Sequence, residues 1–158
     1  MPYHSGSIWL LGDCIRYEGS TDYVAWEVPI ASVRVIGEET RAGLVDDWLF
    51  VVGTASHGWH TALVDAAGFD EFLVQLSAHL GAKLTLELVS VYDFADRVSW
   101  PPTHAGRPLY KFIPDENPSL CRRILLLSWK TYSKVLSDDV RALLESHPTQ
   151  DSGPMIQD

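Results

Sequence analysis

The sequence predicts an α+β fold: an antiparallel, barrel-like sheet plugged by an amphipathic helix, with a helical C-terminal extension. Apolar residues alternate with a period of two in the N-terminal part, whereas residues 68–80 repeat them at helical spacing. With 158 residues, of which 46% are hydrophobic, the chain is long enough to bury a core without disulfides or metals. We expect a single domain over residues 1–146, with the sheet and helix in 1–81 and the extension in 82–146.

The strands are predicted by alternation between turn signals. Val24, Trp26 and Val28 share one face of a strand that must end at Pro29, because proline cannot donate to a sheet. The segments SIWLLGDCIRYEG before it and SVRVIGEET after it also have extended character. WLFVVGT is an apolar run of strand length with little alternation, which favours a strand covered on both sides.

The stretch TASHGWHTALVD predicts a hairpin, with ASHG as the loop between two strands. Gly58 is expected to supply a positive φ that other residues resist. His57 then lies in the loop and His60 on the second strand, so their side chains diverge. This separation argues against a shared site for the two histidines.

Residues 68–80 are the clearest helix. One stripe holds apolar side chains at i, i+3, i+4, i+7 and i+11, namely Phe69, Phe72, Leu73, Leu76 and Leu80. Acidic residues in the first turn and His79 in the last turn match the helix dipole, and Gly81 fits the stop position. This order of strands followed by a helix resembles the pleckstrin-homology-like superfold. The resemblance concerns shape and implies no single function.

The extension is predicted in pieces. Leu84, Leu86 and Leu88 favour a short strand, and a short helix from Val91 must end near Trp100, before two prolines. Residues 103–118 read as a loop with a short strand at LYKFI, and Asn117-Pro118 is a good helix start.

Residues 119–130 fit either a helix or a buried strand, and helix is our preferred interpretation. Ser137 is expected to cap a final helix, SDDVRALLES. Residues 147–158 are expected to form a disordered tail.

Composition restricts the partners. The net charge of −9 argues against binding to nucleic acid and against binding to an anionic membrane surface. It is compatible with a basic partner protein. The chain shows no signal-peptide pattern and no apolar run of membrane-spanning length, so a cytoplasmic location is the default expectation. Cys14 and Cys121 are expected to be reduced.

The sequence offers no catalytic residue, metal site or cofactor motif that meets its chemical requirements. A metal site needs three or four converging ligands, and TASHG lacks the strand-to-helix turn of a nucleophile elbow. No glycine-rich phosphate loop is present, so we expect no cofactor.

These features favour a non-catalytic protein-binding module. One version is an immunity-type protein that masks a toxin, because such proteins are typically small, acidic and without catalytic motifs. Trp100, Asp46 and Asp47 form the candidate interaction surface.

Two alternatives stay open. One is a small enzyme with a site assembled in three dimensions around His57, His60 and Asp65. The other is a self-associating subunit, which makes a homo-oligomer.

Overall fold

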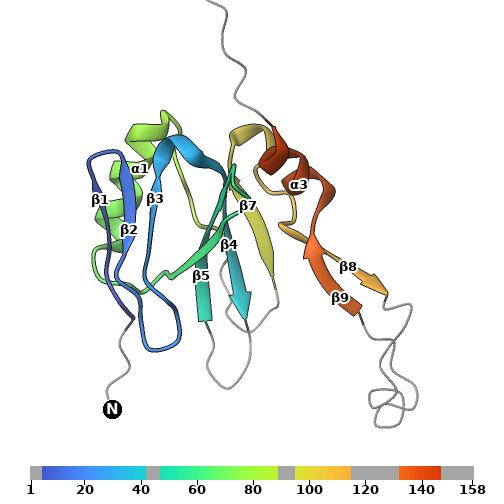
Figure 1. Cartoon of the computed structure of the whole chain (residues 1–158), viewed down its shortest axis with the longest axis horizontal. Helices are drawn as coiled ribbons and strands as arrows, with labels where there is room; N and C mark the ends of the chain where they lie inside the picture. Colours follow the sequence, from blue (N-terminus) through green and yellow to red (C-terminus); the bar gives the residue numbers. More distant parts are fainter. Residues whose placement is uncertain (1–4, 42–46, 89–94, 115–131, 147–158) are drawn as a thin grey trace, which may run out of the picture.

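A computed structural model describes residues 5–41, 47–88, 95–114 and 132–146. Over these ranges the chain forms antiparallel sheets and two α-helices (Figure 1), which confirms the predicted α+β class. The preferred helix at 119–130, the helix start at Asn117, Cys121, Asp46 and the tail at 147–158 lie outside the described residues.

The N-terminal sheet has the order β1-β2-β3 and is antiparallel throughout. Its strands are β1 (Ile8–Leu11), β2 (Cys14–Tyr17) and β3 (Trp26–Pro29). Gly12, with φ +59°, makes the turn between β1 and β2. Strand β3 ends at Pro29, as predicted, and the 3-10 turn η1 (Ile30–Ser32) leads out of this sheet.

The second sheet has the order β6-β5-β4-β7, again antiparallel. Its strands are β4 (Val33–Arg41), β5 (Asp47–Thr54), β6 (Trp59–Leu63) and β7 (Asp96–Trp100). A separate hairpin pairs β8 (Tyr110–Pro114) with β9 (Tyr132–Leu136), and Figure 1 shows it projecting from the body of the protein. The 3-10 turn η2 (Pro102–His104) lies between β7 and β8.

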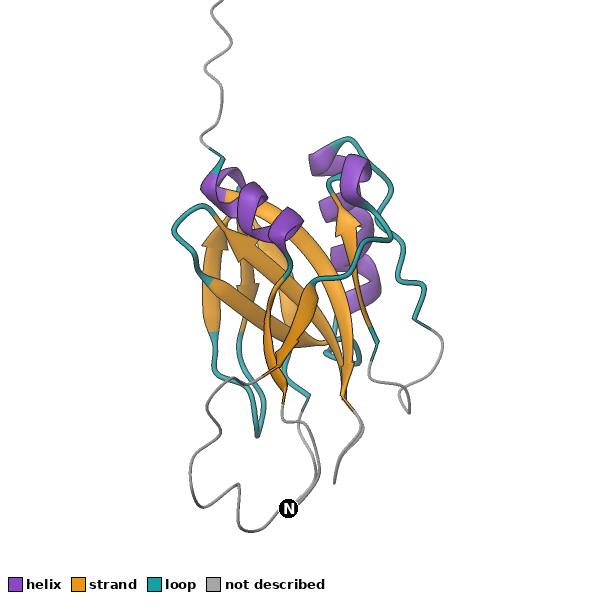
Figure 2. Ribbon diagram, turned by 90° about the vertical axis from the view of Figure 1, so that its right-hand side faces the viewer, coloured by secondary structure: helices purple, strands orange, loops and turns teal. Residues whose placement is uncertain are grey.

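The second sheet is covered on both faces, as the apolar run in WLFVVGT predicted. Phe50 and Val52 of β5 join one buried cluster, whereas Leu49 and Val51 join another. The period of two sends successive side chains to opposite faces, so an uninterrupted apolar strand fills two cores. Figure 2 shows the two helices on opposite sides of the strands.

Helix α1 (Phe69–Leu80) covers the core that the N-terminal sheet shares with the second sheet. Phe69, Phe72 and Leu76 of the predicted stripe are buried there, and Gly81 ends the helix in the left-handed conformation. Helix α3 (Asp138–Glu145) packs Val140 into the other core. Its cap is the predicted one, since Ser137 Oγ accepts from the Val140 amide at 3.3 Å.

The described residues form no closed barrel, so the predicted barrel-like sheet is not confirmed. The strands fall into three sheets. Pro29 and η1 turn the chain between β3 and β4, and β4 then pairs with β5 and β7 instead of continuing the β3 ladder. An isolated bridge between Ser7 and Ala67 links the start of β1 to the segment after β6.

Three local predictions were wrong in detail. The ASHG loop exists, but its left-handed residue is His57, with φ 59°, and not Gly58. Gly58 is required for space, because an added Cβ would lie 2.6 Å from Thr54 Oγ1. Residues 96–100 form strand β7 instead of the predicted helix end, because β4 offers them an open edge. Residues 84–88 are extended and alternate in burial, but they join no ladder.

Candidate functional site

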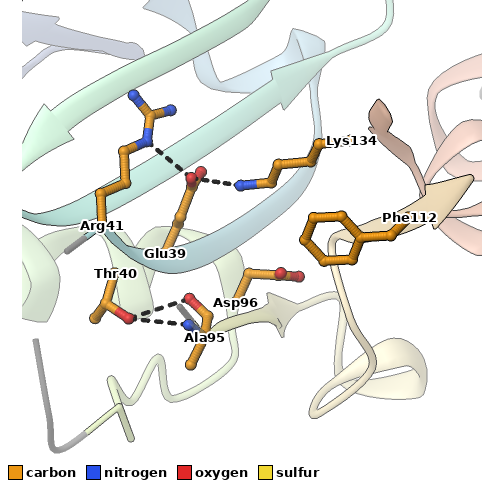
Figure 3. Close-up of a pocket in the computed structure, with 7 residues that line it drawn as sticks. All are labelled: Glu39, Thr40, Arg41, Ala95, Asp96, Phe112 and Lys134. Carbon is orange, nitrogen blue, oxygen red and sulfur yellow. Dashed lines mark hydrogen bonds and ion pairs between the residues drawn. The ribbon is translucent and has the colours of Figure 1, made fainter. Parts of the chain in front are cut away.

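A cleft of about 520 Å³ lies between the end of the second sheet and the β8–β9 hairpin (Figure 3). Its size is within the range of small-molecule and side-chain binding pockets. Strands β4, β7, β8 and β9 all contribute lining side chains, together with the residue just before β7: Glu39, Thr40, Arg41, Ala95, Asp96, Phe112 and Lys134. These positions are far apart in sequence and meet only in the folded chain.

The strand registers explain why these side chains converge. Glu39 of β4 is the direct partner of Asp96 on β7, so their side chains leave the same face of the sheet. Phe112 of β8 is the direct partner of Lys134 on β9, and both lie on the hairpin face that lines the cleft. Thr40 fixes the start of β7, because its hydroxyl accepts from the Ala95 amide at 3.1 Å.

Glu39 is buried, with 1% of its surface exposed, and three side chains donate to it. Arg41 Nε lies 2.8 Å and Lys134 Nζ 2.6 Å from Oε1, and the Tyr110 hydroxyl donates to Oε2 at 3.0 Å. Burial alone would raise the pKa of Glu39, but the hydrogen bonds and charges of Arg41 and Lys134 hold that pKa below its ordinary value. Glu39 is therefore ionised at neutral pH and ties the hairpin to the second sheet.

Tyr110 extends this network to β6. Its hydroxyl accepts from Trp59 Nε1 at 2.9 Å and its ring packs against the Trp59 ring at 5.8 Å between centroids. Burial, and after it the charge of Glu39, raises the pKa of Tyr110 far above its ordinary value. The hydroxyl therefore keeps its proton and stays a hydrogen-bond donor to Glu39.

Asp96 accepts hydrogen bonds from the described residues through one of its two carboxylate oxygens. Oδ1 accepts from the amides of Leu109 at 2.6 Å and Tyr110 at 3.1 Å, which anchors the start of β8. Among the described residues no group donates to Oδ2, and Figure 3 shows this carboxylate directed toward the side of the cleft where Phe112 lies. Burial raises the pKa of Asp96, and the two backbone hydrogen bonds offset only part of that increase.

The neighbouring residue on β4, Glu38, lies on the opposite face and is fully buried. Backbone amides donate to it from Glu87 at 2.7 Å and Leu88 at 3.3 Å, and Trp48 Nε1 donates at 3.1 Å. Arg97 Nη1 lies 3.6 Å from its Oε1. This carboxylate takes the place of a strand partner for the extended segment at 84–88, and it does not line the cleft beside the hairpin.

The structure does not bring together the three residues of the enzyme alternative. His57 is exposed in the β5–β6 loop, whereas the His60 ring packs 5.4 Å from the Trp26 ring. Burial lowers the pKa of His60. Asp65 follows the other end of β6 and accepts from Ser5 Oγ at 2.9 Å.

Two described residues of the predicted interaction surface also lie apart. Trp100 pairs with Ile36 and Asp47 pairs with Arg41, which are five positions apart on β4, or about 17 Å. Trp100 is half-buried against the core, and Asp47 accepts from the Tyr23 hydroxyl at 2.6 Å. That these two residues form one interface with Asp46 stays a prediction.

Sequence reasoning missed Glu39, Asp96 and Lys134. The available signal was the pair of acidic residues inside the apolar strand VRVIGEET, since a charged residue is rarely buried without partners. The partners themselves come from β8 and β9, and nothing local in the sequence indicates them.

Neither a search for metal sites and membrane-spanning helices nor comparison with known proteins indicates a family for this chain. Over the described ranges, no cluster of three or more His, Cys, Asp or Glu side chains has the arrangement of a metal site. None of the helices in those ranges is long and apolar enough to cross a membrane. Comparison with protein-family models, with curated proteins and with solved structures finds nothing that matches this chain.

Proposed function

We propose that the protein is a non-catalytic module that binds a basic partner protein at the cleft and on the adjoining β8–β9 hairpin. The observation that carries the proposal is the exposed apolar surface of the β8–β9 hairpin beside a cleft whose lining includes two carboxylates. Acidic and aromatic groups together suit lysine and arginine side chains.

The hairpin has the exposed apolar surface that an interface requires. Three large hydrophobic side chains on it are exposed: Phe112 by 59%, Ile113 by 43% and Tyr132 by 53%. Aromatic side chains are enriched at protein interfaces, where covering them with a partner removes apolar surface from water. In the free protein this surface faces solvent, so a partner that covers it gains the corresponding hydrophobic free energy.

The charge of the chain supports a basic partner. A net charge of −9 attracts cationic proteins over long range and accelerates their association at low ionic strength. An immunity-type protein that masks a basic toxin is one specific form of this proposal. A pleckstrin-homology-like arrangement of the strands around α1 is a separate proposal about shape, and no part of the function depends on it.

Nuclear magnetic resonance with two matched peptides tests the proposal. One peptide alternates lysine with leucine, and its control replaces each lysine with glutamate. We expect the basic peptide to shift backbone signals of residues 39–41, 95–97, 110–114 and 132–134, and the acidic peptide to shift none. The affinity should fall as salt is added, because the attraction is partly electrostatic.

Shifts that map instead to α1 or the N-terminal sheet, or the absence of binding, would contradict the proposal. Light scattering on the free protein tests the competing case of a second copy. A monomer mass at high concentration supports a different protein as the partner, whereas a dimer that buries the hairpin would overturn it.

A further inference from the structure

Two aromatic–carboxylate pairs can be defined at the cleft: Tyr110 contacts Glu39 beside it, and Phe112 lines it together with Asp96. Tyr110 and Phe112 are two positions apart on β8, so both rings leave the same face of the hairpin. Glu39 and Asp96 are direct partners across β4 and β7, so both carboxylates leave the same face of the sheet. The hairpin thus sets Tyr110 against Glu39 and carries Phe112 into the cleft that Asp96 also lines.

A cation from the chain itself occupies the first pair. Lys134 Nζ lies 3.8 Å from the centroid of the Tyr110 ring and 2.6 Å from Glu39 Oε1. An ammonium group between an aromatic face and a carboxylate gains from the ring quadrupole and from a charge-assisted hydrogen bond. The protein therefore already contains one example of this recognition geometry.

The second pair has no such cation among the described residues. Asp96 Oδ2 receives no hydrogen bond there, and no lysine or arginine lies over the Phe112 ring. The ring is 59% exposed, so its face is open to a partner. Both pairs line or adjoin the same cleft, and Lys134 occupies the pair formed by Tyr110 and Glu39.

We infer that the cleft takes a lysine or arginine side chain of the partner protein, with its stem against Phe112 and its charged head on Asp96 Oδ2. This inference rests on the proposed function and specifies how the partner is held. The partner's side chain would lie against Phe112 as Lys134 lies against Tyr110, two residues further along β8.

Hydrogen-bonding capacity, and not net charge, supports a cation at Asp96, because Arg41 and Lys134 already balance the charges of Glu39 and Asp96 and the charge of Lys134 also acts on Asp96. Glu39 is contacted by two cations, Arg41 and Lys134, so it has no free oxygen to offer. Among the described residues, one oxygen of Asp96 has no donor, and its other oxygen is held in place by backbone donors. A guest ammonium or guanidinium would meet a carboxylate whose position is already fixed, so little ordering is needed on binding.

Binding of the basic peptide to the full chain and to four variants tests the inference by calorimetry. Asp96→Asn keeps an oxygen for the two amides and removes the charge, and we expect the affinity to fall about tenfold or more. Phe112→Ala should lower it about threefold to tenfold, whereas Phe112→Tyr should restore it, because the ring face returns. Asp13→Asn removes the same charge from a carboxylate 91% exposed at the β1–β2 turn, and should change affinity less than twofold, or about 0.4 kcal/mol.

The outcomes separate the two proposals. If the peptide binds at the hairpin but Asp96→Asn and Phe112→Ala leave its affinity unchanged, the inference fails and the proposed function stands. If no basic peptide binds, both fail. Thermal unfolding of each variant shows whether a loss of affinity reflects lost folding. Free lysine that binds as tightly as the peptide would overturn the assignment to a partner protein.

Discussion

Glu38 and Glu39 are neighbours on β4, both are buried, and they lead to two different kinds of site. Glu38 faces the α1 side, where two backbone amides and an indole donate to it. Glu39 faces the hairpin side, where its donors are the side chains of Arg41, Lys134 and Tyr110. The same residue type thus closes a gap in the fold on one face and organises a cleft on the other.

The difference lies in the donors. Backbone donors cannot move away without unfolding the segment that carries them, so a carboxylate that holds them is a structural element. Side-chain donors at the mouth of a cleft keep part of their surface in water, as Arg41 and Lys134 do here. A buried acid with such donors can prepare a surface for a ligand while the fold stays unchanged.

Removal of Glu38 should have the largest effect. Glu38→Ala removes a fully buried carboxylate and leaves the part-buried amides of Glu87 and Leu88 and the Trp48 indole without their acceptor. We expect the free energy of unfolding to fall by about 3–5 kcal/mol. Urea denaturation measures this loss, and Glu38→Gln, which keeps one acceptor oxygen, should lose less. Equal stability of Glu38→Ala and the wild type would show that the segment at 84–88 holds without it.

Removal of Glu39 should have a smaller effect that is concentrated in the hairpin. Glu39→Ala releases Lys134 and Tyr110, but Lys134 can return to water, so we expect a loss of about 1–3 kcal/mol. Hydrogen exchange should accelerate in β8 and β9 and stay unchanged in β1, β2 and β3. Uniform acceleration across all strands would contradict the role of Glu39 as a local clamp, and Glu38→Ala serves as the reference for a global loss.

Predictions from the sequence were confirmed where burial alone decides the structure. The apolar run around Phe50, the stripe from Phe69 to Leu76 and the cap at Ser137 depend on local spacing and on water. The strand β7 was missed because Val91, Phe94 and Val98 happen to be spaced as on a helix, whereas the open edge of β4 decides the outcome.

The cleft could not be predicted for a related reason. Lys134 reaches Glu39 across 95 positions of sequence, and Asp96 reaches β4 through a register that no local pattern specifies. The one available signal, two adjacent glutamates inside an apolar strand, was not used in the sequence predictions. It contained no indication that one glutamate would find backbone amides and the other would find a lysine.

The smallest expected effect is the pH dependence of the free energy of unfolding. Acidification should change the contributions of Asp96 and Glu39 to this free energy in opposite directions. The pKa of Asp96 in the folded protein lies above its ordinary 3.8, so on acidification the folded state takes up a proton before the unfolded state does. The stability of the wild type relative to Asp96→Asn should therefore rise as the pH falls from neutral toward 3.8.

The pKa of folded Glu39 lies below its ordinary 4.5, so its contribution is complete above 4.5 and is lost as the pH falls through the folded pKa. Glu39→Gln should thus cost most near neutral pH and least in acid. Arg41, Tyr110 and Lys134 also face these carboxylates, and the pKa values of Arg41 and Tyr110 are raised further above this acidic range. Urea denaturation of the two variants and the wild type from neutral pH into acid measures both trends. If the two differences change in the same direction, the environments of the two carboxylates do not differ as described. In the described residues Glu39 accepts from three side chains, whereas Asp96 accepts only from two backbone amides.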